Sequence, residues 1–186
     1  MTNRAIYHIT HVENLAGMIR EGRLWCDARR ISQSLVNTNI GYNHIKERRM
    51  RHPVMVAAGG TLGNYVPFNF CPRSVMLYVV AQGHENYSSG QRPIVHLISS
   101  IRVILATGRP WFFTDRHADL SYASQFDTLD RLDEVGWSVM SRRYWSDPDV
   151  KEKRQAEFLV RDWFPWSAIA VLGAQAHWIK TMTSCN

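Results

Sequence analysis

Short segments rich in β-branched and aromatic residues recur from one end of the chain to the other, and this pattern limits the fold more than any other feature. Each segment is short enough to be a single strand, and turn-forming residues separate many of them. The segments lie at residues 6–10, 65–70, 76–80, 94–98, 111–114, 158–160 and 169–172. Because they outnumber the helical patterns and do not alternate with them regularly, the sequence predicts a mixed α+β fold and not a doubly wound one.

Helical patterns are few. One helix is expected from Val12 to Gly22, where the glycine can end it, and a basic one from Tyr42 to Arg51. Residues 25–39 are mixed and polar, and we expect a loop there. Residues 101–106 suit a short helix or a strand, and residues 116–155 form a long polar and aromatic segment with a helix inside it.

One predicted strand carries a carboxylate, Glu157. Side chains alternate between the two faces of a strand, so one face carries Ala156, Phe158 and Val160. Glu157 points to the other face together with Gln155. A glutamate in this position is either solvated or lines a cleft, and the strand alone favours the solvated alternative, because carboxylates usually stay in contact with water.

Length and composition limit the class of protein. The 186 residues suit a single domain, residues 1–186, that needs no metal or disulfide to hold its core. No apolar run approaches the roughly 20 residues of a membrane helix, and the N-terminus lacks the layout of a signal peptide. Cys26, Cys71 and Cys185 are odd in number and far apart, which argues against a disulfide framework or a zinc site. We therefore expect a soluble, cytoplasmic protein that does not bind a membrane.

The net charge of +6 is concentrated in clusters. One cluster surrounds His44 and contains Lys46, Arg48, Arg49 and Arg51; further basic residues lie at 142–143 and 151–154. Tyr144 and Trp145 follow the first of these pairs. Basic clusters beside aromatic rings suit a nucleic acid, whose phosphates bind the charges and whose bases stack on the rings. A solvated basic surface is the alternative.

Common catalytic motifs are absent from the sequence. It has no glycine-rich phosphate loop and no Gly-x-Ser-x-Gly elbow. His8 and His11 share no face of the predicted strand and have no carboxylate near them, so we expect no metal site. His8 and Thr10 do share a face, and together they can hydrogen-bond ribose hydroxyls or a carboxamide. The alternative is a half-buried histidine whose hydrogen bonds are made within the protein. The guanidinium of Arg48 or Arg49 is suited to binding a pyrophosphate. The alternative is that both arginines lie on the solvated surface of a helix.

Several stretches together resemble the DarT family of DNA ADP-ribosyltransferase toxins. The matching stretches are residues 7–11 with 14, 15 and 17; 44–49; 59–62 with 65–68; 71–74 with 76–78; 113–117; and 154–157 with 159–160. They occur in the order of the family and cover about residues 6–170. The resemblance implies an ADP-ribosyltransferase fold, in which a split β-sheet core with peripheral helices holds NAD in a cleft.

The resemblance also implies an activity, which is the transfer of ADP-ribose from NAD to a base, most often thymine, in single-stranded DNA. Arg49 and Glu157 fall on the catalytic residues of the family. The NAD-binding positions fall on His8, Ile9, Thr10, Gly17, Leu24 and Arg49, with residues 33–51 folding over the NAD. We expect DNA contacts at His44, Arg48, Arg51, His117, Tyr144 and Arg154. No metal is expected, and the implied partner besides single-stranded DNA is a macrodomain antitoxin.

The chemistry of the reaction fits these residue types. Cleavage of the nicotinamide–ribose bond builds positive charge on the ribose, which the carboxylate of Glu157 can stabilise. A guanidinium is rarely deprotonated, so we expect Arg49 to orient the base or the phosphates, and Glu157 or a water to accept the proton of the base.

Two points remain open. The activity has rivals, namely ADP-ribosylation of guanine, RNA or protein, and an inactive nucleic-acid-binding homologue. The tail from Ala174 to Lys180 shows no match to the family, which usually continues further. A C-terminus shortened in this way would weaken the edge of the sheet and would leave the NAD and glutamate positions untouched.

Overall fold

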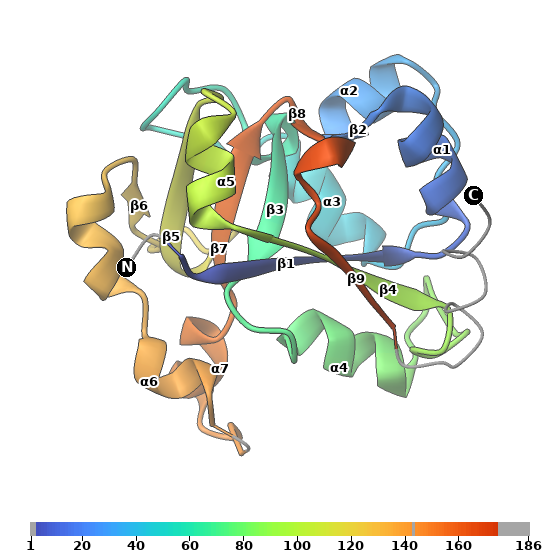
Figure 1. Ribbon diagram of the computed structural model, residues 1–186. Helices are drawn as coiled ribbons and strands as arrows, with labels where there is room; N and C mark the ends of the chain where they lie inside the picture. The colour runs from blue at the N-terminus through green and yellow to red at the C-terminus, as the bar shows by residue number, and fades with distance from the viewer. Residues whose placement is uncertain (1–2, 143, 175–186) are drawn as a thin grey trace.

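The computed structural model describes residues 3–142 and 144–174, and it has the expected α+β architecture (Figure 1). The strands are β1 (Ala5–His11), β2 (Arg23–Trp25), β3 (Tyr65–Asn69), β4 (Ile94–Ser100), β5 (Trp111–His117), β6 (Gln125–Phe126), β7 (Ala156–Arg161), β8 (Trp163–Pro165) and β9 (Val171–Ala174). The helices are α1 (Asn14–Glu21), α2 (Asp27–Ser32), α3 (Asn43–Arg49), α4 (Val75–Gln82), α5 (Ile101–Ala106), α6 (Trp137–Met140) and α7 (Pro148–Lys153). Three short 3-10 helices are η1 (Leu62–Asn64), η2 (Leu129–Glu134) and η3 (Trp166–Ala168).

The large sheet is divided near its middle. Its seven strands are antiparallel neighbours in the order β6-β5-β7-β3-β1-β4-β9, and β2 and β8 form a second sheet. β1 pairs with β4 along its whole length, but it meets β3 at a single pair, Tyr7 opposite Asn69. On its other side β3 pairs with β7 from Tyr65 to Asn69, where Asn69 stands opposite Glu157. The sheet therefore consists of two halves that separate beyond this one pair, which is the split core expected for the fold class.

A hydrophobic core joins the two halves below the split. Ile6 and Leu97 come from one half, Phe68 and Phe158 from the other, and all four are fully buried in the same cluster. Leu159 belongs to a separate cluster on the opposite face of the sheet. The alternation expected for this strand is therefore confirmed, and both faces of β7 are covered.

The helices surround the sheet without covering it evenly. In Figure 1, α1, α2 and α3 gather on one side of β1, and α4 lies on the other side. α1 ends as expected at Gly22, whose positive φ of 66° suits glycine and whose N–H caps the carbonyl of Ile19. The small sheet pairs the buried Leu24 with the buried Phe164, and it fixes the end of α1 against the core.

Two sequence expectations about secondary structure were wrong. Residues 76–80, expected to be a strand, lie in helix α4, because an apolar run of this length suits either state and Ser74 starts a helix there by accepting a hydrogen bond from the Leu77 N–H at 3.1 Å. Residues 25–39, expected to be a loop, contain the end of β2 and all of α2. Residues 101–106, left open between helix and strand, form α5.

The long segment before β7 is mostly irregular. It contains β6, η2, α6 and α7. Asp147 caps the start of α7, because its carboxylate accepts hydrogen bonds from the N–H groups of Asp149 and Val150. The tail from residue 175, for which the sequence analysis found no match to the family, lies outside the described residues. Within residues 3–142 and 144–174 no helix has the length and apolar character needed to span a membrane.

Candidate active site

A cavity of about 330 Å³ opens where the two halves of the large sheet separate, which is a usual size for a small-molecule site. Its wall includes residues from β1, α1, β2, α2, α3, β3, α4 and β7. The structure brings together eight of the residues predicted from sequence: His8, Ile9, Thr10, Gly17, Leu24, Arg49, His117 and Glu157. The remaining predicted residues lie outside this wall.

Glu157 lies on the floor of the cavity, held by the irregularity between β5 and β7. The register of these strands shifts between Phe113 and His117, as in a β-bulge. The shift brings the hydroxyl of Thr114 within 3.1 Å of the Glu157 N–H, which donates to it. The side chain of Glu157 is only 7% exposed, so the cleft-lining alternative holds and the solvated one does not.

Arg49 and Glu157 form a bidentate ion pair in the cavity. Arg49 Nη1 donates to Glu157 Oε1 at 2.9 Å, and Nη2 donates to Oε2 at 2.8 Å. Burial raises the pKa of Glu157, but the charges of Arg49 and then His117 outweigh it, so the pKa is lowered overall. Burial likewise lowers the pKa of Arg49, but Glu157 outweighs it and the pKa is raised. Both groups are therefore charged near neutral pH.

The start of the long segment between β5 and β7 touches the same carboxylate. The Ala118 N–H donates to Glu157 Oε1 at 3.4 Å, and His117 Nε2 lies 3.8 Å from that oxygen. The pKa of His117 is lowered, mainly by burial and despite the attraction of Glu157, so the imidazole is neutral near pH 7. Among the described contacts, Glu157 Oε2 accepts only from Arg49, which leaves this oxygen able to accept from a ligand hydroxyl.

His8 reaches across the split in the sheet. Its Nδ1 lies 2.8 Å from the carbonyl oxygen of Pro67 on β3. Because a carbonyl only accepts, Nδ1 must carry the hydrogen, and Nε2 is left as an acceptor in the neutral ring. Burial lowers the pKa of His8, which keeps the ring neutral near pH 7.

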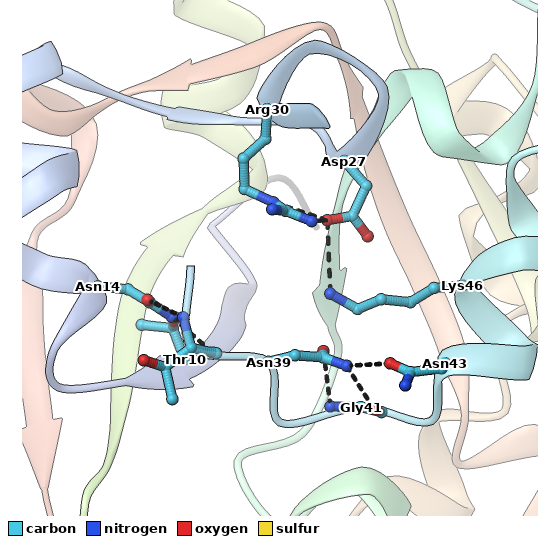
Figure 2. Close-up of polar contacts among 9 residues, drawn as sticks. Thr10, Asn14, Asp27, Arg30, Asn39, Gly41, Asn43 and Lys46 are labelled. Atoms are coloured by element: carbon cyan, nitrogen blue, oxygen red, sulfur yellow. Dashed lines mark hydrogen bonds and ion pairs between the residues drawn. The ribbon is translucent and has the colours of Figure 1, made fainter. Parts of the chain in front are cut away.

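An amide ties the floor of the cavity to the segment above it (Figure 2). Asn14 Nδ2 donates to Thr10 Oγ1 and to the Thr38 carbonyl, both at 3.0 Å, and Asn14 Oδ1 accepts from the Thr38 N–H at 2.7 Å. Asn39 then holds the next turn by donating to the Gly41 carbonyl and to Asn43 Oδ1, both at 2.8 Å. We call residues 33–42 together with α2 and α3 the cover of the cavity.

A charged group within the cover was missed from the sequence (Figure 2). Asp27 Oδ1 accepts from Arg30 at 3.1 Å and lies 3.5 Å from Lys46 Nζ, and all three residues line the cavity. Burial raises the pKa of Asp27, but Lys46 and then Arg30 outweigh it and lower the pKa overall. The group has one more positive than negative charge, which suits an anionic ligand. The group was missed because a loop was expected in place of helix α2, where Asp27 and Arg30 lie.

The residues expected to contact DNA are mostly outside the cavity. His44 and Arg51 are exposed at the two ends of α3, and Tyr144 is 81% exposed. Arg48 is 58% exposed and forms an ion pair with the buried Asp119, to which its Nε donates at 2.7 Å. His117 is the residue of this set that lies in the cavity.

Arg154 is in a position that does not suit the expected DNA contact. It is 1% exposed, and its guanidinium donates to four backbone carbonyls, those of Val139, Met140, Arg142 and Arg73. Because these carbonyls surround the group, Arg154 holds the segment at 139–142 against the start of α4. The sequence could not distinguish this role from an exposed charge, because the carbonyl partners are remote along the chain.

The cavity combines a charged carboxylate, a fixed guanidinium, two neutral imidazoles and a basic cover. Within the described ranges, no three His, Cys, Asp or Glu side chains are grouped so that they could hold a metal ion. The arrangement can bind a polyphosphate ligand that carries hydroxyl groups, and it can stabilise positive charge developing next to Glu157.

Comparisons with known proteins agree with this geometry. The family model described as ssDNA thymidine ADP-ribosyltransferase, DarT, matches residues 7–185. The match includes the tail after Ala174, so the expectation that this tail resembles nothing in the family was wrong. A protein named DNA ADP-ribosyl transferase from Thermus sp. (strain 2.9) is 46% identical over 165 residues, which are 88% of this chain and 78% of the relative.

Two solved structures of the Thermus sp. 2.9 DarT are also similar. The complex with ADP-ribosylated ssDNA has a TM-score of 0.91 at 42% identity and covers 97% of this chain and 86% of the other. The complex with NAD+ has a TM-score of 0.86 at 38% identity and covers 98% and 87%. The expected enzyme class, an NAD-dependent mono-ADP-ribosyltransferase, is thereby confirmed, and the chain belongs to the DarT family of ssDNA thymidine ADP-ribosyltransferases.

Proposed function

We propose that this chain transfers ADP-ribose from NAD+ to the ring nitrogen of thymine in single-stranded DNA and releases nicotinamide. The observation that carries the proposal is the bidentate Arg49–Glu157 pair on the floor of the cavity, next to a basic cover. The complexes of the Thermus relative with NAD+ and with ADP-ribosylated ssDNA support NAD+ as the co-substrate and single-stranded DNA as the acceptor.

Glu157 acts on the ribose. The bond between nicotinamide and the ribose breaks with its electron pair leaving on nicotinamide, and positive charge develops on the ribose. The carboxylate of Glu157 stabilises this charge, while its Oε2 accepts a hydrogen bond from a ribose hydroxyl. The lowered pKa of Glu157 keeps it ionised for this role and makes it a weak proton acceptor.

Arg49 orients Glu157 and the substrates, and it does not act as a base. Its pKa is raised by Glu157 beyond that of an already weakly acidic guanidinium, so losing a proton is unfavourable. When the thymine nitrogen forms the new bond to the ribose, its proton goes instead to a water or to the neutral His117, which lies beside Glu157.

The ligand sites follow from the wall of the cavity. His8, Ile9, Thr10, Gly17 and Leu24 form the NAD+ site together with Arg49. The charged group at Asp27, Arg30 and Lys46 faces the pyrophosphate. For the DNA strand, the exposed His44, Arg51 and Tyr144 provide charge and a ring outside the cavity, and His117 meets the acceptor base inside it.

The test is incubation of the chain with NAD+ and short single-stranded oligonucleotides that contain or lack thymidine. We expect nicotinamide release and a mass gain of one ADP-ribose on the thymidine-containing strand only. A gain on guanine-only strands, on RNA or on protein would identify one of the rival acceptors. A chain that releases no nicotinamide with any acceptor would contradict the proposal and favour a nucleic-acid-binding homologue without turnover.

The partner implied by the family resemblance is a macrodomain antitoxin that removes ADP-ribose from DNA. One feature of the cavity fits such a toxin: Arg49 and Glu157 are already paired and charged near neutral pH in the chain alone. A macrodomain hydrolase added to the modified oligonucleotide should restore its original mass if the linkage is the one proposed.

A further inference from the structure

Helix α3 carries Arg49, yet none of its residues is buried. A helix of seven residues without an apolar buried face is not positioned by packing, and it is too short to be stable by itself. The direction of Arg49 must therefore be set by the other contacts of α3. Two of these contacts are ion pairs made by the consecutive residues Arg48 and Arg49. Arg49 meets Glu157 on the floor of the cavity. Arg48 meets the buried Asp119 outside the cavity wall.

The Arg48 pair is asymmetric. Its partner Asp119 has a side chain that is 1% exposed, whereas the side chain of Arg48 is 58% exposed. Arg48 Nε donates to Asp119 Oδ2 at 2.7 Å, and Asp119 Oδ1 has no hydrogen-bond partner among the described residues, with His52 Nδ1 3.7 Å away. A buried carboxylate that lost Arg48 would be left without a strong partner, which is costly.

Asp119 belongs to the same short segment that touches Glu157. His117 lies 3.8 Å from the Glu157 carboxylate, and the Ala118 N–H donates to it at 3.4 Å. Residues 117–119 thus contact Glu157 at one end and Arg48 at the other. The two ion pairs therefore join adjacent residues of α3 to Glu157 and to the segment that contacts Glu157.

We propose that Arg48 and Asp119 form a positioning pair that fixes the rotation of α3 so that Arg49 meets Glu157 in its bidentate geometry. Arg48 is then a positioning residue and not a DNA phosphate contact as the sequence suggested. To bind a phosphate in place of Asp119, Arg48 would have to leave a buried carboxylate unpaired. The inference rests on the proposed function, because it assigns Arg48 and Asp119 to the same reaction.

The test compares Arg48→Met, Asp119→Asn and the double variant with the wild-type chain. Methionine keeps the length of the Arg48 stem, and asparagine keeps the shape of Asp119. We expect each single variant to lower kcat for DNA modification at least 10-fold with little change in KM for the oligonucleotide. We expect the double variant to be no slower than the slower single variant, because both changes remove one interaction. Arg48→Lys, which keeps the charge, should recover part of kcat.

Salt dependence separates positioning from phosphate contact. Loss of one phosphate contact to a single strand reduces the slope of log affinity against log salt by roughly 0.7. We expect Arg48→Met to leave this slope unchanged and Arg51→Met, at an exposed position beside it, to reduce the slope and raise KM for the oligonucleotide. Glu47→Gln, on the exposed face of α3, serves as the neutral control.

Two results would overturn the inference. One is a reduced salt slope and raised KM in Arg48→Met with kcat intact. The other is Asp119→Asn with wild-type kcat. Thermal unfolding midpoints measured with and without NAD+ report whether each variant is folded and still binds the co-substrate. Failure of the proposed function is distinguishable, since it would appear in the wild-type chain as absence of nicotinamide release.

Discussion

The floor and the cover of the cavity are built by different physical means. On the floor, β7 buries Phe158, Leu159 and Val160 directly after Glu157. The cover contains two helices, α2 and α3, without a buried residue between them, and it is held by amide hydrogen bonds and ion pairs. Apolar burial is worth roughly 1.5–3 kcal/mol for each large side chain, whereas a typical hydrogen bond contributes about 0.5–1.5 kcal/mol.

This difference separates two tasks. In the proposed reaction the carboxylate of Glu157 has to stay in one place, and the hydrophobic floor fixes it. The cover has to admit and release a charged ligand, and its polar contacts can be exchanged for contacts to that ligand at little net cost. Substitutions on the floor should therefore affect stability or chemistry, and those in the cover should affect ligand affinity.

The largest effect is expected within the catalytic pair. Glu157→Gln keeps the shape of the side chain and removes its charge, so the developing positive charge on the ribose loses its stabilisation. We expect DNA modification to fall by at least roughly 10²–10³-fold, to below detection in a standard assay. Arg49→Lys keeps a cation near Glu157 and should retain part of the NAD+ cleavage, measured as nicotinamide release. Equal and complete loss of both reactions in both variants would contradict this division of roles.

A core position on the floor should lower stability most. Phe158 packs against Trp111 and Phe113, and it is fully buried. Phe158→Ala should cost about 3–5 kcal/mol of unfolding free energy, because it removes a large side chain from a closed core. Urea unfolding followed by fluorescence measures this loss. A cost below about 1 kcal/mol would mean that the floor is not the rigid part of the site.

A contact that holds the cover in place should change affinity more than stability. Asn14→Ala removes the hydrogen bonds that tie Thr38 to Thr10, so we expect the Kd for NAD+ to rise roughly 10-fold with a loss of about 1 kcal/mol in unfolding free energy. Isothermal titration with NAD+ and urea unfolding give the two values. Asn43→Ala, which removes a more exposed amide contact of the cover, is the matched control and should change both values less. A large loss of unfolding free energy with little change in the Kd for NAD+ would show that the cover stabilises the fold itself.

The smallest effect is expected from a change of pH. It alters the stability of the fold through two groups on the floor, His117 and Glu157. Burial lowers the pKa of His117 from 6.5, so the unfolded chain takes up a proton first and stability falls as the pH drops below 6.5. The pKa of Glu157 is lowered from 4.5 because Arg49 and His117 outweigh burial, so a second loss begins below 4.5. One pKa unit corresponds to about 1.4 kcal/mol.

Thermal unfolding midpoints across this pH range provide the measurement. His117→Asn should flatten the decline just below pH 6.5, and Glu157→Gln the decline below 4.5. His44→Gln, which changes an exposed histidine, is the control for histidine replacement. A decline that is the same in His117→Asn as in the wild-type chain would assign the first loss to another group.

The sequence predicted the parts of the molecule that local chemistry determines. Alternation along β7 separated Glu157 from Phe158 correctly, and Gly22 ended α1 where a glycine was needed. The resemblance to the DarT family then identified the fold and the enzyme class. Local patterns failed at residues 76–80, because a short apolar run is equally compatible with a helix and a strand.

The partners of charged side chains were harder to predict. Arg154 and Arg48 are both arginines in basic stretches, yet one is enclosed by carbonyls and the other is paired to a buried aspartate. Asp27 and Lys46 meet across nineteen positions of the sequence. Such partners come from distant parts of the chain, and composition and periodicity contain no information about which of them will meet.

β1 and β3 pair only at Tyr7 and Asn69, and this leaves room for a cleft inside a continuous sheet. The edges of an open sheet normally invite pairing with other strands, and a gap within a sheet would do the same. Here the free backbone groups beyond the pair face a ligand cavity, and part of their hydrogen-bonding capacity is taken by His8, which bonds to Pro67. Because these unpaired backbone groups lie inside the cavity, strands of other chains cannot pair with them.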